Sequence, residues 1–265
     1  GLNLVSGLED GFGGVWVGAA PYLMFIPDTD GDDKPDGKPE VLLDGFGWHD
    51  THETLNAFNW GPDGWLYGCH GVFTHSKVGK PGTPESERIP MNAAVWRFHP
   101  QRKTFEVFAH GTSNPWGVDF NDHGQAFITA CVVPHLYHVI QGARYQRQAG
   151  QHFDPYTYDD IKTCADHLHY NGDQWQSSRN GASSDFGGGH AHCGLSIYLG
   201  DNFPEEFRGK LLFNNLHGHR VNQEMVERKG SGYVGKHQPD FLFSNDKQHM
   251  GVSLRYGPDG GLFLT

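Results

Sequence analysis

The feature that most constrains the fold is a strand–turn–strand pattern that recurs along the chain. Short apolar runs flank turns such as Gly-Pro-Asp-Gly and Asn-Asp-His-Gly, and one longer polar loop carries Pro204 and Gly209. Glycine takes the positive-φ position of such turns and Asp caps them, so each copy predicts a β-hairpin. The copies are residues 56–69, 116–131, 194–214 and 253–265.

The spacing of these hairpins predicts their architecture. The turn glycines Gly64 and Gly124 lie about 60 residues apart, and Gly260 follows at about twice that distance with one hairpin between. Strand pairs repeated at this spacing are typical of propeller blades, and the alternative is a β-sandwich of unrelated hairpins. We expect an all-β chain, a β-propeller with about four and a half four-stranded blades visible, belonging to a ring of six or more.

Composition agrees with a sheet protein and excludes several functions. The chain has 265 residues with 37 Gly, 13% aromatic and 19% charged residues, which fits many tight turns. The net charge of −11 and the lack of a basic stripe argue against nucleic acid as a partner. No apolar run reaches the length of a membrane span. We expect one propeller domain over residues 1–265, incomplete at both ends and with no signal peptide in view.

The four cysteines leave their pairing open. Cys69, Cys131, Cys164 and Cys193 show no Cys-x-x-Cys spacing, which argues against a zinc ribbon or a c-type haem attachment. A Cys131–Cys193 bridge, a Cys69–Cys131 bridge and buried free thiols all agree with the hairpin positions.

A polar insertion interrupts the blade pattern at residues 144–189. It is rich in Gln, His, Asp and Gly, and residues 154–169 within it can form a helix. A long polar segment in a regular scaffold forms either a lid over a site or a surface excursion, and both interpretations stay open.

An acidic loop near the N-terminus predicts a calcium site. The loop carries carboxylates at alternate positions, Asp28, Asp30 and Asp32. A fourth carboxylate, Asp36, follows four residues after Asp32. Calcium needs six to eight oxygen ligands, which a tight loop of carboxylates can supply. The loop is not an EF-hand, because Asp33 stands where glycine is usual. The alternative is a solvated acidic turn.

Histidines recur at equivalent points of the predicted blades. The inner strands of a propeller all line one channel, so the residues before them gather at one entrance. Those residues are His49, His52, Asn114, His190, His192 and His249, and the residues after the second strands include His70, His135, His138, His217 and His219. Neutral imidazoles that converge can bind a transition metal, or one imidazole can serve as a general base. The alternative is a set of structural histidines that tie blade loops together.

Three motifs resemble those of the quinoprotein sugar and sorbosone dehydrogenases. They are the block from Gly194 to Lys210 with His217-Gly218, the order of His52 before Gly61-Pro62-Asp63-Gly64, and Asn114-Pro115. The chain is most similar to a branch described as membrane-bound dehydrogenases, often fused to a c-type cytochrome. The sequence departs from the family where Ser113 and Trp116 flank Asn114-Pro115.

The resemblance implies a function. His52 would take a hydroxyl proton from a sugar or polyol while hydride passes to pyrroloquinoline quinone (PQQ), with calcium polarising the quinone. His49, Asn114, His190, His192, His217, Arg220 and His249 would line the cofactor and substrate pocket. A cytochrome c would accept electrons, and the protein would be periplasmic or extracellular. Two alternatives stay open: a non-catalytic carbohydrate- or protein-binding propeller with structural His and calcium, and a His-ligated metal-centred enzyme such as a lyase or oxygenase.

Overall fold

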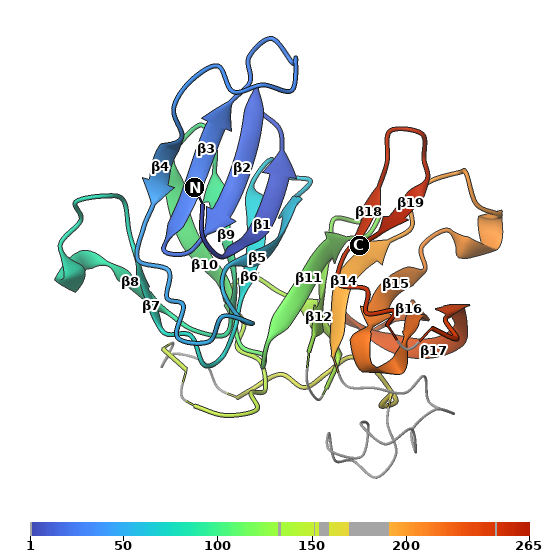
Figure 1. Cartoon of the computed structure of the whole chain (residues 1–265). Coiled ribbons are helices and arrows are strands. Elements are labelled where there is room, and N and C mark those ends of the chain that lie inside the picture. The colour runs from blue at the N-terminus through green and yellow to red at the C-terminus, as the bar shows by residue number, and fades with distance from the viewer. Residues whose placement is uncertain (1, 132–133, 151, 154–158, 170–190, 247) are drawn as a thin grey trace. The chain divides into compact units, whose positions relative to one another are not determined.

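The computed structural model describes residues 2–131, 134–150, 152–153, 159–169, 191–246 and 248–265. The chain divides into two compact units (Figure 1). Unit 1 comprises Gly1–Asn114 and Gln141–Asp160, and unit 2 comprises Pro115–Ile140 and Ile161–Thr265. The helices among the described residues are three short 3₁₀ turns, η1 (Glu85–Glu87), η5 (Glu205–Phe207) and η6 (Leu216–Gly218). No described helix has the length and apolar character that crossing a membrane requires.

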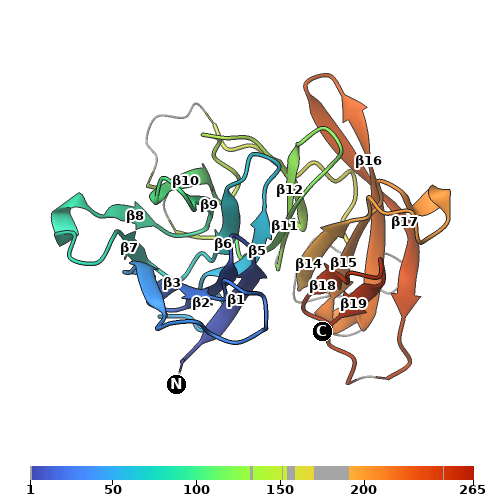
Figure 2. The ribbon, with the colours of Figure 1, turned by 90° about the horizontal axis from the view of Figure 1, so that it is seen from above.

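Unit 1 contains two four-stranded antiparallel sheets, with orders β1-β2-β3-β4 and β10-β9-β6-β5. The edge strands β1 and β5 lie side by side, as inner strands of neighbouring blades do (Figure 2). Large aromatic side chains fill the space between the sheets, among them Trp16, Phe46, Phe58 and Trp96. The strands are β1 (Val5–Asp10), β2 (Gly14–Ala19), β3 (Tyr22–Pro27), β4 (Glu40–Leu43), β5 (Asn56–Trp60), β6 (Leu66–His70), β9 (Ala94–His99) and β10 (Thr104–His110), with a small hairpin of β7 (Ser76–Val78) and β8 (Ile89–Met91).

Unit 2 repeats the pattern with sheets of three, four and two strands, ordered β11-β12-β13, β14-β15-β16-β17 and β18-β19. Its edge strand β14 contacts both β11 and β18, again as inner strands of successive blades do. The strands are β11 (Pro115–Phe120), β12 (Ala126–Ala130), β13 (Leu136–Val139), β14 (His192–Ile197), β15 (Leu211–Asn215), β16 (Arg220–Lys229), β17 (Gly232–Phe243), β18 (Leu254–Tyr256) and β19 (Leu262–Leu264).

The four predicted hairpins are confirmed, and so is the expectation that glycine takes a positive-φ position in their turns. Gly64, Gly124 and Gly260 have φ values of 77°, 69° and 76°, the left-handed region that glycine adopts without strain. The first blade has four strands, β1 to β4, and β16 and β17 form a long hairpin beside β15. All four cysteines are free thiols.

The predicted helix in residues 154–169 is not found in its described part, residues 159–169. That segment instead runs beside β17, where Ala165 forms a parallel bridge with Gly235. Gly235 N–H donates to the Cys164 carbonyl (2.8 Å), and Asp166 N–H donates to the Gly235 carbonyl (3.0 Å). These bonds satisfy backbone groups that a helix would otherwise pair internally. Residues 154–158 lie outside the described part of the chain.

Candidate metal centre

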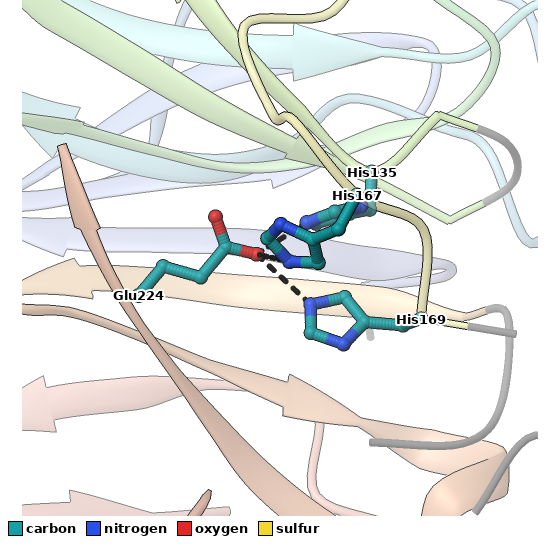
Figure 3. A group of neighbouring side chains, drawn as sticks. All are labelled: His135, His167, His169 and Glu224. Carbon is teal, nitrogen blue, oxygen red and sulfur yellow. Dashed lines mark hydrogen bonds and ion pairs between the residues drawn. The ribbon is translucent and has the colours of Figure 1, made fainter. Parts of the chain in front are cut away.

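Three histidines and one glutamate from separate segments of unit 2 converge on one point (Figure 3). His135 precedes β13, His167 and His169 belong to the segment of residues 161–169, and Glu224 lies in β16. Each residue offers one ligand atom, and these atoms all lie within 4.8 Å of one another. We call this set of four residues the histidine–glutamate cluster.

Two separations within the cluster match those of ligands that share an ion. Glu224 Oε1 lies 2.9 Å from His169 Nε2 and 3.2 Å from His167 Nε2, and it also contacts His135 Nε2. Two ligand atoms that are each about 2.1 Å from a metal ion lie about 3 to 3.5 Å apart. Glu224 is therefore spaced from His167 and His169 as ligands of one transition-metal ion are, whereas its contact with His135 is shorter.

The cluster is buried, so its carboxylate requires polar partners. Glu224 and His169 are fully buried, and His135 is 2% exposed. An isolated buried carboxylate is costly, so a strand carries one at its centre only when partners surround it. The second oxygen, Glu224 Oε2, is buried without a hydrogen-bond partner among the described residues. A Cβ at Gly235 would lie 2.9 Å from this oxygen, so glycine at that position leaves the carboxylate its room.

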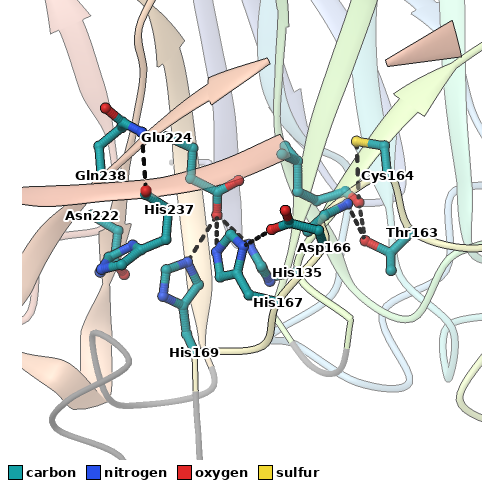
Figure 4. A network of polar contacts seen from close by, with 12 residues as sticks. His135, Thr163, Cys164, Asp166, His167, His169, Asn222, Glu224, His237 and Gln238 are labelled. Carbon is teal, nitrogen blue, oxygen red and sulfur yellow. Dashed lines mark hydrogen bonds and ion pairs between the residues drawn. The ribbon is translucent and has the colours of Figure 1, made fainter. Parts of the chain in front are cut away.

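The segment of residues 161–169 is held so that His167 faces the carboxylate (Figure 4). Cys164 N–H donates to the carbonyl of Leu136, the first residue of β13, at 3.2 Å. Asp166 Oδ1 lies 3.0 Å from His167 Nδ1. A carboxylate on one ring nitrogen fixes the orientation of the imidazole and makes the other nitrogen a better ligand.

The pKa directions of His135 and Glu224 favour a metal-binding protonation state, and that of His167 opposes it. Burial lowers the pKa of His135 to about 4, although Glu224 acts in the opposite direction. Burial alone would raise the pKa of Glu224, but the three histidines lower it well below its usual range. Burial acts to lower the pKa of His167, yet hydrogen bonds with Glu224 and Asp166 leave that pKa raised. At neutral pH the cluster therefore presents an ionised carboxylate and a neutral His135, which is what a metal ion requires of its ligands.

Two further imidazoles flank the histidine–glutamate cluster. The ring centroid of His192 lies 5.1 Å from that of His135 and 5.0 Å from that of His169. The ring centroid of His237 lies 5.1 Å from that of His169 and 5.5 Å from that of His167. Nitrogen donors with one carboxylate suit zinc, iron or another transition metal better than calcium or magnesium, which prefer oxygen ligands.

The predicted site residues of unit 1 lie as follows. His52 is exposed, and its Nδ1 lies 2.9 Å from Asp50 Oδ1. His49 lines an open groove of about 600 Å³ beside the β7–β8 hairpin. Asn114 Oδ1 accepts a hydrogen bond from Val72 N–H at 3.2 Å.

The predicted site residues of unit 2 are His192, His217, Arg220 and His249, and His190 lies outside the described residues. His192 is buried beside the histidine–glutamate cluster, and His217 lies in η6. The backbone carbonyl of His249 lies 2.9 Å from His219 Nδ1. Because the predicted common entrance draws residues from both units, it stays a prediction.

Arg220, predicted to line the cofactor and substrate pocket, has several partners within unit 2. Its Nη1 donates to Asp240 Oδ2 at 2.8 Å, its Nε donates to the Gly218 carbonyl at 3.0 Å, and its guanidinium lies over the Phe243 ring. These contacts hold the guanidinium in place within the unit. The predicted role of Arg220 toward a cofactor stays a prediction.

The acidic loop brings together three of the four aspartates predicted to bind calcium. One carboxylate oxygen each from Asp28, Asp30 and Asp36 lies within the same 4.8 Å limit. Asp32 pairs instead with Lys34 Nζ at 2.5 Å. Asp28 Oδ1 also accepts hydrogen bonds from the backbone, including Gly31 N–H at 3.0 Å. The calcium site stays a prediction.

Sequence reasoning missed three members of the histidine–glutamate cluster. It placed His135 among the recurring histidines but passed over His167, His169 and Glu224. The signals were a His-x-His pair within the polar insertion and one acidic residue within an otherwise buried stretch of strand. Neither signal is specific by itself. The pairing of β16 with the strands around it brings the acidic residue to the histidines, and the sequence does not show that pairing.

Comparison with known proteins places the chain in a family. The whole chain, residues 1–265, matches the family described as "Domain of unknown function (DUF7133)". The chain belongs to this family. No curated protein matches it.

Solved structures are similar in fold at low sequence identity. A glucose dehydrogenase is 16% identical with a TM-score of 0.58, over 97% of this chain and 72% of that one. A functionally unknown protein from Desulfotomaculum acetoxidans is 10% identical with a TM-score of 0.51, over 98% of this chain and 62% of that one. The soluble aldose sugar dehydrogenase from Escherichia coli is 13% identical with a TM-score of 0.49, over 99% of this chain and 93% of that one. The predicted fold class, an all-β propeller, is confirmed.

Proposed function

We propose that this chain is a metal-dependent propeller enzyme whose histidine–glutamate cluster holds one divalent transition-metal ion. The observation that carries the proposal is the convergence of three imidazole Nε2 atoms on one buried carboxylate oxygen. Burial keeps His135 neutral, and the surrounding histidines keep Glu224 ionised, so an ion would meet the lone pair of His135 and one negative charge.

The chemistry of such a centre depends on its coordination number. Four protein ligands close a tetrahedral ion, which is the pattern of a structural site. The same four ligands leave two positions open on a six-coordinate ion, where a substrate oxygen or water can bind. In that case the ion polarises a carbonyl or hydroxyl oxygen of the substrate as a Lewis acid. The resemblance described above supports a carbohydrate-type substrate for this reaction.

Metal analysis tests this proposal directly. We expect the purified chain to carry about one transition-metal ion per molecule, and Glu224→Gln to lose it, because the amide supplies no charge to balance the ion. The matched control is His138→Gln, a histidine of the same unit whose Nε2 bonds to Gln125 Oε1 at 2.9 Å. The control should keep the metal. Equal metal content in wild type and Glu224→Gln would refute the centre.

Cobalt(II) distinguishes a catalytic centre from a structural one. An open six-coordinate site gives weak visible absorption that changes when a polyol or azide is added, whereas a closed tetrahedral site gives intense bands that do not. The second result would leave the chain a metal-stabilised binding propeller rather than an enzyme.

A second candidate is a sugar or polyol dehydrogenase in which His52 is the base, and one contact favours it. Asp50 Oδ1 lies 2.9 Å from His52 Nδ1 on an exposed loop, so the carboxylate orients the ring with its other nitrogen available to accept a substrate proton. In this candidate PQQ would take the hydride, a cytochrome c would accept the electrons, and the protein would be periplasmic or extracellular. These three features rest on the family resemblance.

A dye-linked oxidation assay with sugars and polyols tests the second candidate, with and without added PQQ. We expect His52→Ala to abolish quinone-dependent dye reduction, because the base that takes the hydroxyl proton is then missing, and to leave metal content and folding unchanged. Turnover by His52→Ala equal to that of wild type would remove His52 from the mechanism.

A further inference from the structure

We infer that His237 is a fifth protein ligand of the metal centre in the histidine–glutamate cluster, bound through Nδ1 at the position that a substrate or small anion displaces. The inference rests on the proposed metal centre and adds a displaceable ligand to it. It concerns a residue outside the set whose ligand atoms already converge.

Strand register places the His237 side chain on the same face as Glu224. In the β16–β17 pair, Glu224 and His237 are directly opposite one another. Side chains of directly opposed residues in an antiparallel pair project to the same side, with Cβ atoms about 5 Å apart. Figure 4 shows His237 beside Glu224, next to His169.

One ring nitrogen of His237 needs a partner. Nδ1 is buried with no hydrogen-bond partner among the described residues. A buried polar atom without a partner is unfavourable, and a ligated metal ion would satisfy it. The charged groups around the ring are His167, His169, Glu224 and Asp240. The ring centroid lies 5.1 Å from that of His169 and 5.5 Å from that of His167, whereas the three clustered histidines are 4.3 to 5.3 Å from one another.

Exposure and anchoring together identify His237 as the ligand that can be displaced. His167 is also partly exposed, at 17%, but Asp166 Oδ1 holds its Nδ1 at 3.0 Å. His135, His169 and Glu224 are 2% exposed or less, and the neighbouring His192 is 1% exposed. His237 is only half-buried, so it can swing away without opening the core. A substrate oxygen that enters from this side would replace one imidazole nitrogen and leave four ligands in place.

The test titrates the chelator-stripped protein with cobalt(II) against a chromophoric chelator and then adds azide. His237→Ala should bind cobalt about tenfold to a hundredfold more weakly than wild type. The cobalt-loaded variant should bind azide more tightly, because the fifth position is already open. These opposite changes distinguish a ligand from a residue that merely supports the fold.

Two conservative variants sharpen the assignment. Asparagine places a donor atom near the position of His Nδ1, whereas glutamine places one near Nε2. His237→Asn should therefore recover part of the cobalt affinity, and His237→Gln should not. His138→Ala is the matched control, and circular dichroism confirms folding of each variant.

The outcomes separate this inference from the proposed function. Cobalt binding that depends on Glu224, together with wild-type cobalt and azide affinities in His237→Ala, would overturn the role of His237 and leave the centre standing. A wild-type chain that binds no cobalt would overturn both. Should His237→Ala fail to fold, His237→Asn and His237→Gln decide the question, because equal affinities in those two variants contradict ligation through Nδ1.

Discussion

Each unit buries a histidine whose pKa falls far below its usual value, and the two histidines differ in what faces their rings. In unit 1, His70 Nε2 lies 2.7 Å from Ser76 Oγ, and burial lowers its pKa to about 3. In unit 2, burial lowers the pKa of His135 to about 4 while its Nε2 contacts Glu224. Burial makes the imidazole neutral in both places. Several imidazoles reach one point beside Glu224, so convergence on the carboxylate rather than burial marks the candidate site.

The same contrast separates two Asp–His pairs. Asp50 and His52 in unit 1 are 2.9 Å apart with the histidine side chain 91% exposed. Asp166 and His167 in unit 2 are 3.0 Å apart with the histidine side chain 17% exposed. An exposed pair contributes little to stability because solvent and salt screen it. The half-buried pair fixes the orientation of a ring whose other nitrogen lies 3.2 Å from Glu224 Oε1.

Acid should destabilise both units, and this is the largest effect we expect. His70 and His135 have pKa values lowered from 6.5 to about 3 and about 4, so between these limits the unfolded chain binds protons that the folded chain does not. Stability therefore falls as pH drops below about 6.5, by about 1.4 kcal/mol per pH unit for each histidine. Glu224, whose pKa is also lowered, adds to the loss below about 4.5. The raised pKa of His167 opposes this trend.

Urea unfolding of the metal-free protein between pH 7 and pH 4 measures this dependence. His70→Gln should reduce the slope by about one proton, and His135→Gln should do the same independently, because the two rings lie in different units. Saturating metal should protect only unit 2 above about pH 6. An unchanged slope in His70→Gln would contradict the assignment of a neutral buried His70.

The fold could be predicted because its signals are local. The turn sequences around Gly64, Gly124 and Gly260 fix positive-φ positions within a few residues, and alternating apolar runs fix the strands beside them. The β16–β17 hairpin is not among the four predicted hairpins, because its solvent-facing half carries charged residues that weaken the apolar alternation. The helix expected in residues 154–169 was wrong for its described part, since tertiary pairing with Gly235 decides that backbone.

The candidate site was less predictable because it depends on contacts between distant residues. Glu224 bonds to His135 and His169, which lie 89 and 55 residues away along the chain. Counting histidines at blade ends identified His135 and His192 as residues of interest. It could not identify Glu224, because a single carboxylate in a strand belongs to no motif. Strand register alone decides which side chains it faces.

The two Asp–His pairs give the smallest and sharpest test. Asp166→Asn removes the charge that holds His167 Nδ1, so metal affinity should fall about tenfold to a hundredfold, the usual cost of losing a partner behind a metal ligand. Asp50→Asn is the matched control in unit 1 and should leave metal affinity unchanged. Chelator competition with zinc and cobalt measures both variants, and Asp166→Glu should recover part of the loss. Equal affinities in Asp166→Asn and Asp50→Asn would mean that His167 is not a ligand, and the centre would then consist of His135, His169 and Glu224, with His237 as its displaceable ligand.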